Sequence, residues 1–204
     1  MSIILTIVWV LIGYFFGSIP WGLIIGKVFY KTDIREYGSG NLGGTNAGRV
    51  LGKKAGIAVT ILDALKAFAM MTICYQLTPD AAPYCGMAVC VGHCFPYFAG
   101  FKGGKAVACT FGYLLALGLF STKDVVFTFF FPLLFFFMML GLFKMVSLAS
   151  MTSLVFASLI GFLTYGNMKF AITTLLITIF VIYRHWPNIK RIIHGKEAKV
   201  SYII

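Results

Sequence analysis

Seven apolar runs separated by short polar segments constrain this chain more than any other feature of its sequence. They cover residues 3–28, 55–77, 81–98, 106–120, 125–143, 146–165 and 170–183. A helix needs about 20 mostly apolar residues to span a bilayer, whose interior offers no water to backbone polar groups. The runs therefore predict an all-α integral membrane protein with about seven transmembrane helices, of which the third, fourth and seventh are the shortest. Because no internal repeat is visible, we expect one membrane-embedded domain over residues 1–204.

The composition supports a membrane location. Charged residues make up 11% of the chain, against about 25% in a soluble domain. The formal net charge of +11 would suit a nucleic-acid-binding protein, but the basic residues lie between the apolar runs and form no soluble basic face. We therefore expect no nucleic-acid partner. The N-terminal run has neither a basic leader nor a small-residue cleavage site, so it is interpreted as a retained first span.

Neither metal chemistry nor disulfide chemistry is indicated by the sequence. The five cysteines lack the paired spacing of a zinc site and the framework of a secreted scaffold, so we expect them to be small packing residues. The acidic residues offer no convergent carboxylate site. They are Asp33, Glu36, Asp63, Asp80, Asp124 and Glu197. We expect neither a metal nor a cofactor.

The distribution of lysine and arginine predicts the orientation of the chain. If the N-terminus lies outside and the number of spans is odd, the basic residues gather in the inside loops and in the C-terminal tail. Only Lys123 and Lys169 then remain outside, and Lys66 lies within a span. The positive-inside rule favours this arrangement, with a cytoplasmic C-terminus. The same arrangement places three polar clusters of the chain at the cytoplasmic face.

The first polar cluster is Gly-Ser-Gly-Asn-Leu-Gly-Gly-Thr-Asn at residues 38–46. Glycine permits positive φ and close backbone approach, so that successive amides can converge on an anion, and flanking arginines can grip a phosphate. A flexible connector between two spans is the alternative interpretation. The predicted substrate-binding residues here are Arg35, Ser39, Gly40, Asn41, Thr45, Asn46 and Arg49.

The second polar cluster is Lys102-Gly103-Gly104-Lys105. We expect its glycine pair to open the next helix, because a helix N-terminus offers free amides and a partial positive charge to an anion. The Walker spacing is missing, so nucleotide binding is not indicated. Lysines that only anchor a span at the membrane face are the alternative interpretation.

The third polar cluster follows the last apolar run, at residues 183–191. Within it, His185 and Asn188 are three residues apart, so that on a helix they can face one cavity. Pro187 suits the first turn of a new helix. Ser147, together with Ser150, lies at the start of the sixth run on the same predicted face, where either hydroxyl could cap the helix or donate to a ligand phosphate.

Three further polar residues fall inside predicted spans. Asp63 and Lys66 are three residues apart in the second span, where charges are costly and usually face each other or a cavity. A structural pair and a catalytic role both remain open. His93, near the end of the third run, suits either a hydrogen-bonded packing residue or a base.

These clusters favour an integral membrane enzyme that acts on phosphate-bearing substrates. Backbone amides released by glycine, with Lys, Arg, His and Asn donors, are the groups that bind phosphorylated ligands. A transporter or channel for an organic phosphate is the competing class, since such proteins also carry interrupted helices. The gathering of the polar groups at one face, without a visible inverted repeat, favours the enzyme.

At these residues the sequence resembles the bacterial acyl-phosphate:glycerol-3-phosphate acyltransferase family. The resemblance runs nearly end to end. It covers Gly17-Ser18-Ile19-Pro20, the segment from Arg35 to Arg49, Asp63 with Lys66, Gly92-His93 with Phe95-Pro96, Phe101 to Lys105, Val146 to Ser150, and the set His185, Asn188 and Arg191.

The resemblance implies transfer of a fatty acyl group from acyl phosphate to the 1-hydroxyl of sn-glycerol 3-phosphate, the first step of phospholipid synthesis. The expected products are lysophosphatidic acid and phosphate. It also implies a multi-pass protein of the bacterial inner (plasma) membrane, with its active site at the cytoplasmic face. The expected partners are the two substrates and membrane lipids, and we expect a monomer.

The resemblance also suggests roles for individual residues. Lys105 would balance charge on the acyl phosphate, and Ser147, His185 and Asn188 would complete the catalytic group. Lys102, Gly103 and Gly104 would join the first cluster in binding the substrates, and Asp63, Lys66 and His93 would support them. His185, His93 or the departing phosphate would accept the proton.

The sequence departs from the family pattern at four positions. Gly44 replaces the usual alanine, Ala106 the usual glycine, Cys109 a small residue or threonine, and Trp186 the usual arginine. The last change removes one cation that could contact a phosphate. The chain also lacks a His-x-x-x-x-Asp arrangement, which marks the large acyltransferase class that uses acyl-CoA or acyl carrier protein, so acyl phosphate is favoured as the donor.

Overall fold

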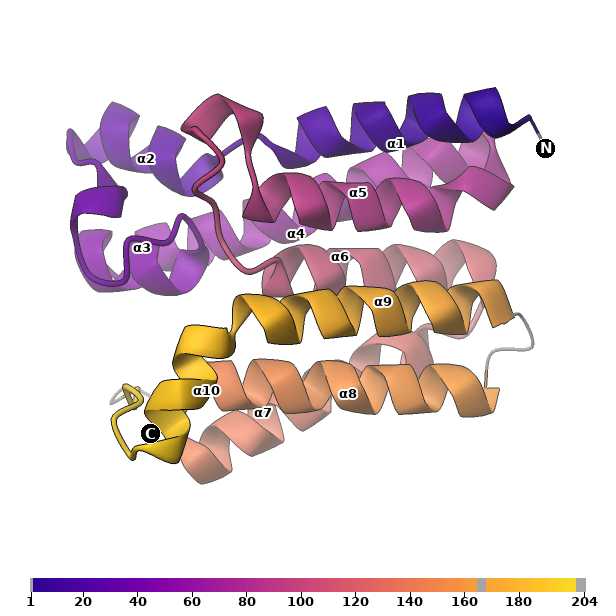
Figure 1. Ribbon diagram of the computed structural model, residues 1–204. Coiled ribbons are helices and arrows are strands. Elements are labelled where there is room, and N and C mark those ends of the chain that lie inside the picture. Colours follow the sequence, from indigo (N-terminus) through magenta and orange to yellow (C-terminus); the bar gives the residue numbers. More distant parts are fainter. Residues whose placement is uncertain (1, 165–167, 201–204) are drawn as a thin grey trace. The chain divides into compact units, whose positions relative to one another are not determined.

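The computed structural model describes residues 2–164 and 168–200, and every regular element within these two ranges is helical. The chain divides into two compact units (Figure 1). Unit 1 is Met1–Ala116 and unit 2 is Leu117–Ile204. The predicted all-α fold class is confirmed, and each unit is described separately below.

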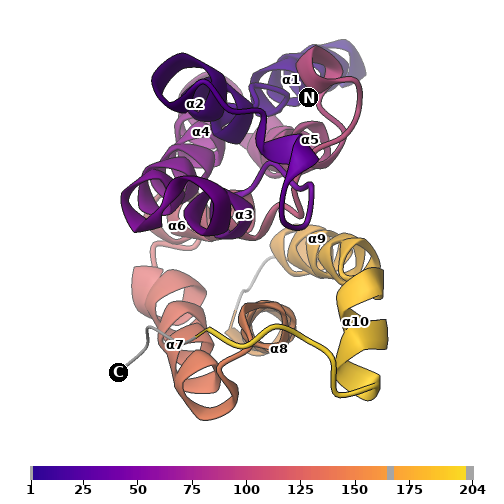
Figure 2. The same ribbon diagram turned by 90° about the vertical axis from the view of Figure 1, so that its left-hand side faces the viewer.

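Unit 1 is built around one long helix, α4, which packs against α3, α5 and α6, while α1 lies along α5 (Figures 1 and 2). Its elements, in chain order, are α1 (Ile3–Gly17), α2 (Trp21–Tyr30), η1 (Ile34–Glu36), α3 (Gly44–Leu51), α4 (Lys53–Leu77), η2 (Pro79–Ala81), α5 (Ala82–Cys94), η3 (Tyr97–Ala99) and α6 (Val107–Ala116).

Glycine allows α1 and α5 to approach each other at backbone distance. A Cβ at Gly17 would lie 2.3 Å from the carbonyl oxygen of Val89, and a Cβ at Gly92 would lie 2.2 Å from that of Tyr14. Membrane helices lack a hydrophobic force between them, so close packing through small residues is one of their main attractions. The glycines of this interface are therefore packing residues.

In the part of the chain that the structure describes, four helical segments are long and apolar enough to cross a membrane: Ile3–Tyr30, Lys53–Leu77, Val126–Phe143 and Val146–Thr164. They match the first, second, fifth and sixth predicted runs. The first contains a break at Pro20, between α1 and α2, because proline lacks the N–H that a continuous helix needs. The predicted end of the sixth run, at residue 165, lies outside the described residues.

The third and fourth predicted runs form shorter helices than expected. Helix α5 has 13 residues, about 20 Å at 1.5 Å per residue, while the bilayer core is about 30 Å thick. It ends at Cys94 because Pro96 disfavours helical backbone at the residue before it. The fourth run corresponds to Val107–Ser121, also below spanning length. The number of seven spans and the orientation of the termini therefore stay predictions.

Unit 2 places α8 between α7 and α9 (Figures 1 and 2). Its elements are η4 (Leu117–Ser121), η5 (Val126–Phe130), α7 (Phe131–Phe143), α8 (Val146–Thr164), α9 (Met168–Arg184) and α10 (Trp186–Ile193). Buried hydroxyls join α8 to α9, since the Ser158 and Thr178 oxygens lie 2.8 Å apart. Such interhelical hydrogen bonds are typical of membrane bundles.

Helix α10 leaves α9 at an angle of 60°. The bend lies at His185, and Pro187 falls in the first turn of α10, where its missing N–H costs nothing. The prediction that Pro187 begins a new helix is confirmed. If α9 and α10 together form one broken span, the candidate spans number five among the described residues.

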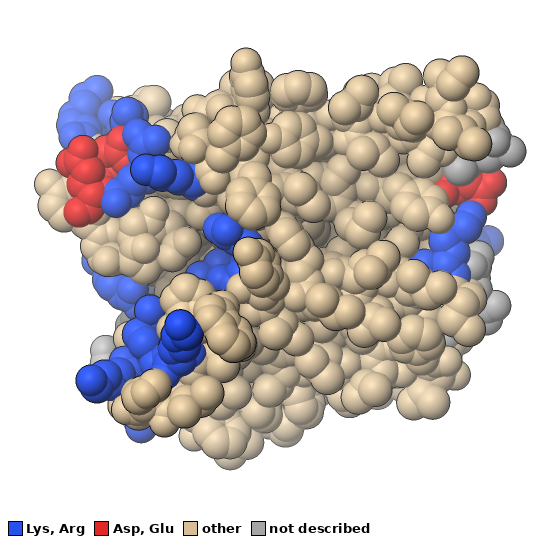
Figure 3. Space-filling view, in the orientation of Figure 1, with Lys and Arg blue, Asp and Glu red and all other residues tan. Residues whose placement is uncertain are grey.

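Charged and apolar side chains occupy different parts of the surface of each unit. Lys and Arg side chains gather over α2 and α3 in unit 1 and over α10 in unit 2 (Figure 3). Along α1, large apolar side chains are exposed, among them Ile3 at 77% and Leu11 at 52%. A surface of this kind needs an apolar covering, which lipid supplies to a membrane protein. All five cysteines are buried and free, as expected for packing residues.

Candidate active site

Asn46 organises the glycine-rich loop of unit 1 from the first turn of α3. Its Oδ1 accepts a hydrogen bond from the Ser39 N–H at 2.9 Å, and its Nδ2 donates to the Ile34 carbonyl at 2.9 Å. The side chain is 2% exposed. A buried amide must satisfy both its donor and its acceptor, and Asn46 does so by joining η1 to the loop. The structure thus gives Asn46 a role in shaping the loop, and its contact with a substrate stays a prediction.

Arg35 forms a double ion pair with Asp33 at the edge of the same loop. Its Nε lies 2.9 Å from Oδ1 and its Nη2 lies 2.6 Å from Oδ2. The hydrogen bonds from Arg35 outweigh burial and hold the pKa of Asp33 well below its usual range, and Asp33 in turn raises the pKa of Arg35. Lys27 adds a weaker contact to Asp33 at 3.3 Å. The guanidinium is therefore fixed in direction before any ligand binds.

The other predicted residues of the first cluster lie at or near the surface of unit 1. Ser39, Thr45 and Arg49 are exposed, and Gly40 and Asn41 are half-buried. The Asn41 amide donates to the Ser39 hydroxyl at 3.1 Å. Gly40 has a φ of +67°, the left-handed conformation that glycine permits. The loop thus presents hydroxyl and guanidinium donors outward from a rigid base.

The second cluster is packed against the end of α5. The Gly104 N–H donates to the His93 carbonyl at 3.1 Å, and a Cβ at Gly104 would lie 2.1 Å from His93 Nε2. At Gly103 a Cβ would lie 2.1 Å from the His93 carbonyl oxygen. Both glycines are required by this close contact. Lys102 on one side is exposed, and Lys105 on the other is half-buried.

The glycine pair does not open α6, contrary to the sequence prediction. Helix α6 begins at Val107, because Ala106 has a φ of +61° and cannot belong to a right-handed helix. Lys105 therefore lies in a loop, two residues before the helix. The family glycine that Ala106 replaces would adopt this backbone without strain.

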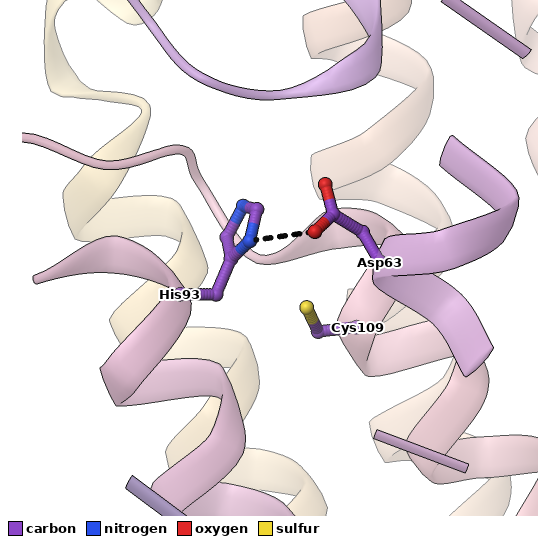
Figure 4. Close-up of side chains that lie close together, drawn as sticks. All are labelled: Asp63, His93 and Cys109. Atoms are coloured by element: carbon purple, nitrogen blue, oxygen red, sulfur yellow. Dashed lines mark ion pairs between the residues drawn. The ribbon is translucent and has the colours of Figure 1, made fainter. Parts of the chain in front are cut away.

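Beneath this loop, a buried polar cluster joins α4, α5 and α6 (Figure 4). Lys66 Nζ lies 2.8 Å from Asp63 Oδ1, 3.0 Å from His93 Nδ1 and 3.1 Å from the Ile19 carbonyl oxygen. The contact with Asp63 is an ion pair, and the contacts with His93 and Ile19 are at hydrogen-bond distance. His93 Nδ1 also lies 3.3 Å from Asp63 Oδ1, the ion pair drawn in Figure 4, and its Nε2 faces Gly104.

Asp63, His93 and Cys109 also have the composition of a metal site. Their side-chain ligand atoms lie within 4.8 Å of one another (Figure 4). However, the Lys66 ammonium is in contact with two of these three groups, and a divalent ion beside it would meet strong repulsion in a medium of low dielectric constant. These side chains are therefore better matched to the Lys66 ammonium than to a bound metal ion. The structural interpretation of the Asp63–Lys66 pair gains support from this geometry.

In unit 2, His185 lies at the bend between α9 and α10 and is 2% exposed. Its Nδ1 lies 2.8 Å from the Val181 carbonyl oxygen. Because a carbonyl only accepts hydrogen bonds, Nδ1 carries the ring proton, and Nε2 of a neutral imidazole can accept a proton. Trp186, the next residue, is 56% exposed, with Lys190 Nζ 5.8 Å from its ring centroid. The indole thus lies at the surface, at the start of α10.

Two predicted residues of unit 2, Ser147 and Asn188, and Arg191 of the same family signature converge on Glu197, which was not a predicted site residue. Ser147 Oγ and Asn188 Nδ2 donate to Glu197 Oε1 at 2.7 Å and 2.6 Å, and Arg191 Nε donates to Oε2 at 2.8 Å. Ser150, in contrast, donates to the Val146 carbonyl within α8. The one available signal was that Glu197 is the only acidic residue after Asp124.

Comparison with known proteins gives consistent results over nearly the whole chain. The sequence model of the family described as glycerol-3-phosphate acyltransferase matches residues 7–195. Proteins named glycerol-3-phosphate acyltransferase from Listeria monocytogenes and Bacillus subtilis strain 168 are each 44% identical to it. The alignments span 199 and 197 residues, which are 95% of this chain in both cases and 96% and 97% of those proteins.

Two solved structures are similar to this one. Both are crystal structures of PlsY, an integral membrane glycerol 3-phosphate acyltransferase, in its glycerol 3-phosphate form and its lysophosphatidic acid form. The first has a TM-score of 0.88 at 34% identity and covers 96% of each chain. The second has a TM-score of 0.85 at 33% identity and covers 96% of this chain and 95% of the other.

Proposed function

The chain belongs to the glycerol-3-phosphate acyltransferase family and is a multi-pass membrane enzyme of this kind, and on this premise we propose its donor and its product. The donor is an acyl phosphate, and the acyl group moves to the 1-hydroxyl of sn-glycerol 3-phosphate. The products are lysophosphatidic acid and inorganic phosphate. The setting is the bacterial inner membrane, with the site at its cytoplasmic face and the protein acting as a monomer.

The proposed donor suits a site without a strong nucleophile. An acyl phosphate is an activated mixed anhydride, so the substrate hydroxyl can attack its carbonyl carbon directly, and phosphate leaves. Both substrates are anions, so the protein must bring two negative groups together. Placement and electrostatic stabilisation by cations and amide donors therefore supply most of the rate.

The observation that carries the proposal is the convergence of Ser147, Asn188 and Arg191 on one carboxylate. These side chains come from α8 and α10 and reach two oxygen atoms within 2.8 Å. A hydroxyl, an amide and a guanidinium directed at one anionic group form the donor set that a phosphate needs. In this proposal they bind the phosphate of glycerol 3-phosphate, and Arg35, Lys102 and Lys105 bind the acyl phosphate.

Lys105 is proposed to balance the charge that develops on the departing phosphate. It lies in the loop that His93 and the two glycines support, so its backbone is fixed. His185 Nε2 or the departing phosphate itself would accept the proton of the attacking hydroxyl. His93 suits this role less, because its Nδ1 already contacts Lys66 and Asp63.

The reaction itself tests the proposal. The purified protein in lipid is given palmitoyl phosphate with and without sn-glycerol 3-phosphate, and palmitoyl-CoA is assayed in parallel. We expect phosphate release that requires glycerol 3-phosphate, and lysophosphatidic acid from palmitoyl phosphate alone. Transfer from palmitoyl-CoA instead would disprove the donor, and no transfer by a folded preparation would disprove the activity.

The assignment of the site is tested by two alanine variants. Lys105→Ala and His185→Ala should each lower turnover at least about 100-fold, the scale of losing one electrostatic or proton-transfer group. Lys123→Ala is the control, since Lys123 is exposed and lies on the predicted outer side. Near-normal turnover in both site variants, with normal membrane insertion, would reject these roles.

A further inference from the structure

Lys66 is an unusual lysine for its position in unit 1. It lies in the middle of α4, a helix that is long and apolar enough to span a membrane, and it is 3% exposed. A charged side chain in such a helix is costly, and it usually has a function or a specific partner. The contacts of Lys66 therefore show which parts of unit 1 it connects.

One contact supplies a donor at the break between α1 and α2. In a continuous helix the Leu23 N–H would donate to the Ile19 carbonyl, four residues earlier. Here it donates to the Pro20 carbonyl at 2.9 Å, so the Ile19 carbonyl loses its helical donor. Lys66 Nζ donates to that carbonyl at 3.1 Å. The lysine thus joins the middle of α4 to the helix break.

A second contact holds His93 beneath the loop that carries Lys105. Lys66 Nζ lies 3.0 Å from His93 Nδ1. Asp63 Oδ1 lies 2.8 Å from Nζ and 3.3 Å from the same Nδ1 (Figure 4). The opposite ring nitrogen, Nε2, faces Gly104, where an added Cβ would overlap it. The loop therefore lies against a ring whose direction is fixed from its other side by a buried ion pair.

The backbone of the loop is also bound to His93. The Gly104 N–H donates to the His93 carbonyl at 3.1 Å, and an added Cβ at Gly103 would overlap the same carbonyl oxygen. Lys105 follows directly in the chain and is half-buried. A shift of His93 would therefore move the residue to which Lys105 is attached.

We propose that Lys66 is a positioning residue for acyl transfer, which acts through His93 on the backbone that carries Lys105. The inference rests on the proposed function of Lys105 as the group that balances charge on the departing phosphate. Such a group must be in place before the reaction begins, because its effect depends on its distance from the developing charge. A displacement of about 1 Å can lower a rate about 100-fold. Lys66 itself need not touch either substrate.

A purely structural role for Lys66 is the alternative, and one double variant separates the two. Loss of Lys66 alone would leave Asp63 buried without its counter-charge, so that a folding defect could explain any loss of activity. Asp63→Leu/Lys66→Met removes both charges together, and such a replacement of a buried ion pair is often neutral for stability or stabilising. It still removes the groups that hold His93 Nδ1.

The experiment is a cycle of variants in which turnover is measured. Asp63→Leu/Lys66→Met and Lys105→Ala are made separately and combined, and each protein is purified in lipid. Formation of lysophosphatidic acid from palmitoyl phosphate is measured per folded protein, with thermal unfolding as the check of folding. Hydrogen–deuterium exchange of residues 95–106 is measured without substrate. Lys54→Met is the control, since Lys54 is an exposed lysine of the same helix.

We expect Asp63→Leu/Lys66→Met to lower turnover roughly 10- to 100-fold, the scale of a misplaced reacting group. Its thermal unfolding should stay near that of the wild type, and its loop should exchange faster. In the Lys105→Ala background the same double change should alter turnover by less than about threefold, because the group that it positions is already absent. Lys54→Met should behave as the wild type in all three measurements.

A second variant tests the link at His93. The side chain of His93→Asn is shorter than the ring, so it leaves space beneath Gly104 while the backbone carbonyl remains. It should also lower turnover in the wild-type background and have little effect in the Lys105→Ala background.

Two results would overturn the inference. Near-normal turnover of Asp63→Leu/Lys66→Met, with unchanged exchange in the loop, would show that Lys66 does not position Lys105. Losses of turnover that multiply with the loss in Lys105→Ala would show that the double change acts on the fold in general. A wild type that is active only with palmitoyl-CoA would refute the proposed donor alone, since the same cycle with that donor still tests Lys66.

Discussion

Ala106 has a backbone conformation that favours glycine. Its φ is +61°, and left-handed backbone costs an L-residue roughly 1–2 kcal/mol. The residue is 1% exposed, and burial of its methyl group stabilises the fold by about 0.8 kcal/mol. We therefore expect Ala106→Gly to raise the free energy of unfolding by up to about 1 kcal/mol, measured by denaturant unfolding in detergent.

Ala99 provides the matched control for this substitution. It is 4% exposed and ends η3, where the backbone is right-handed. Ala99→Gly should lower the free energy of unfolding by about 0.5–1 kcal/mol, the usual cost of glycine in regular structure. If both substitutions destabilise the protein equally, then Ala106 carries no strain.

Lys66 is the residue whose loss should be most costly in unit 1. It is 3% exposed and its ammonium serves both Asp63 and His93. Lys66→Met leaves a buried carboxylate without its counter-charge, which costs about 3–5 kcal/mol of unfolding free energy. The double variant Asp63→Leu/Lys66→Met should be less destabilised than the sum of its single variants. Thermal unfolding of the wild type, the two single variants and the double variant forms a double-mutant cycle. Additive losses of stability in this cycle would show that the pair does not interact.

At the scale of elements, the contact between α1 and α5 depends on Gly17. A Cβ there would lie 2.3 Å from a backbone oxygen of Val89, and backbone cannot move aside as a flexible side chain can. Gly17→Ala should therefore lower the free energy of unfolding by about 1–3 kcal/mol or more, as overpacking does. Gly141, inside α7, has no atom within 4 Å of an added Cβ, so Gly141→Ala should be neutral or stabilising. Equal effects of the two changes would contradict the packing role.

The elements that local chemistry defines were predictable from the sequence. Pro187 marked the start of α10, and the long apolar runs marked α4 and α8. The run at 81–98 was less informative, because hydropathy alone does not show where a helix ends. Pro96 ends the helix early, so that α5 has only 13 residues. Composition alone therefore overstated the length of that helix.

The partners of polar side chains were predictable only where they are near in sequence. Glu197 lies 50 residues from Ser147, and no spacing rule connects a tail carboxylate to the start of α8. Asn46 was predicted from its place in a glycine-rich segment, and its hydrogen bonds to the loop itself were not foreseen. An amide that binds its own backbone and one that binds a substrate look alike in a sequence, since both occur in glycine-rich segments.

At the scale of the whole molecule, the predicted orientation places Lys54 and Lys123 on opposite sides of the membrane. Both are exposed, and the five native cysteines are buried, so Lys54→Cys and Lys123→Cys can be labelled selectively. In intact cells, a membrane-impermeant maleimide should label Lys123→Cys, whereas Lys54→Cys should react only after permeabilisation. The wild type is the control for background labelling. Labelling of Lys54→Cys in intact cells would reverse the orientation, and labelling of neither would mean that an odd number of spans does not separate the two positions.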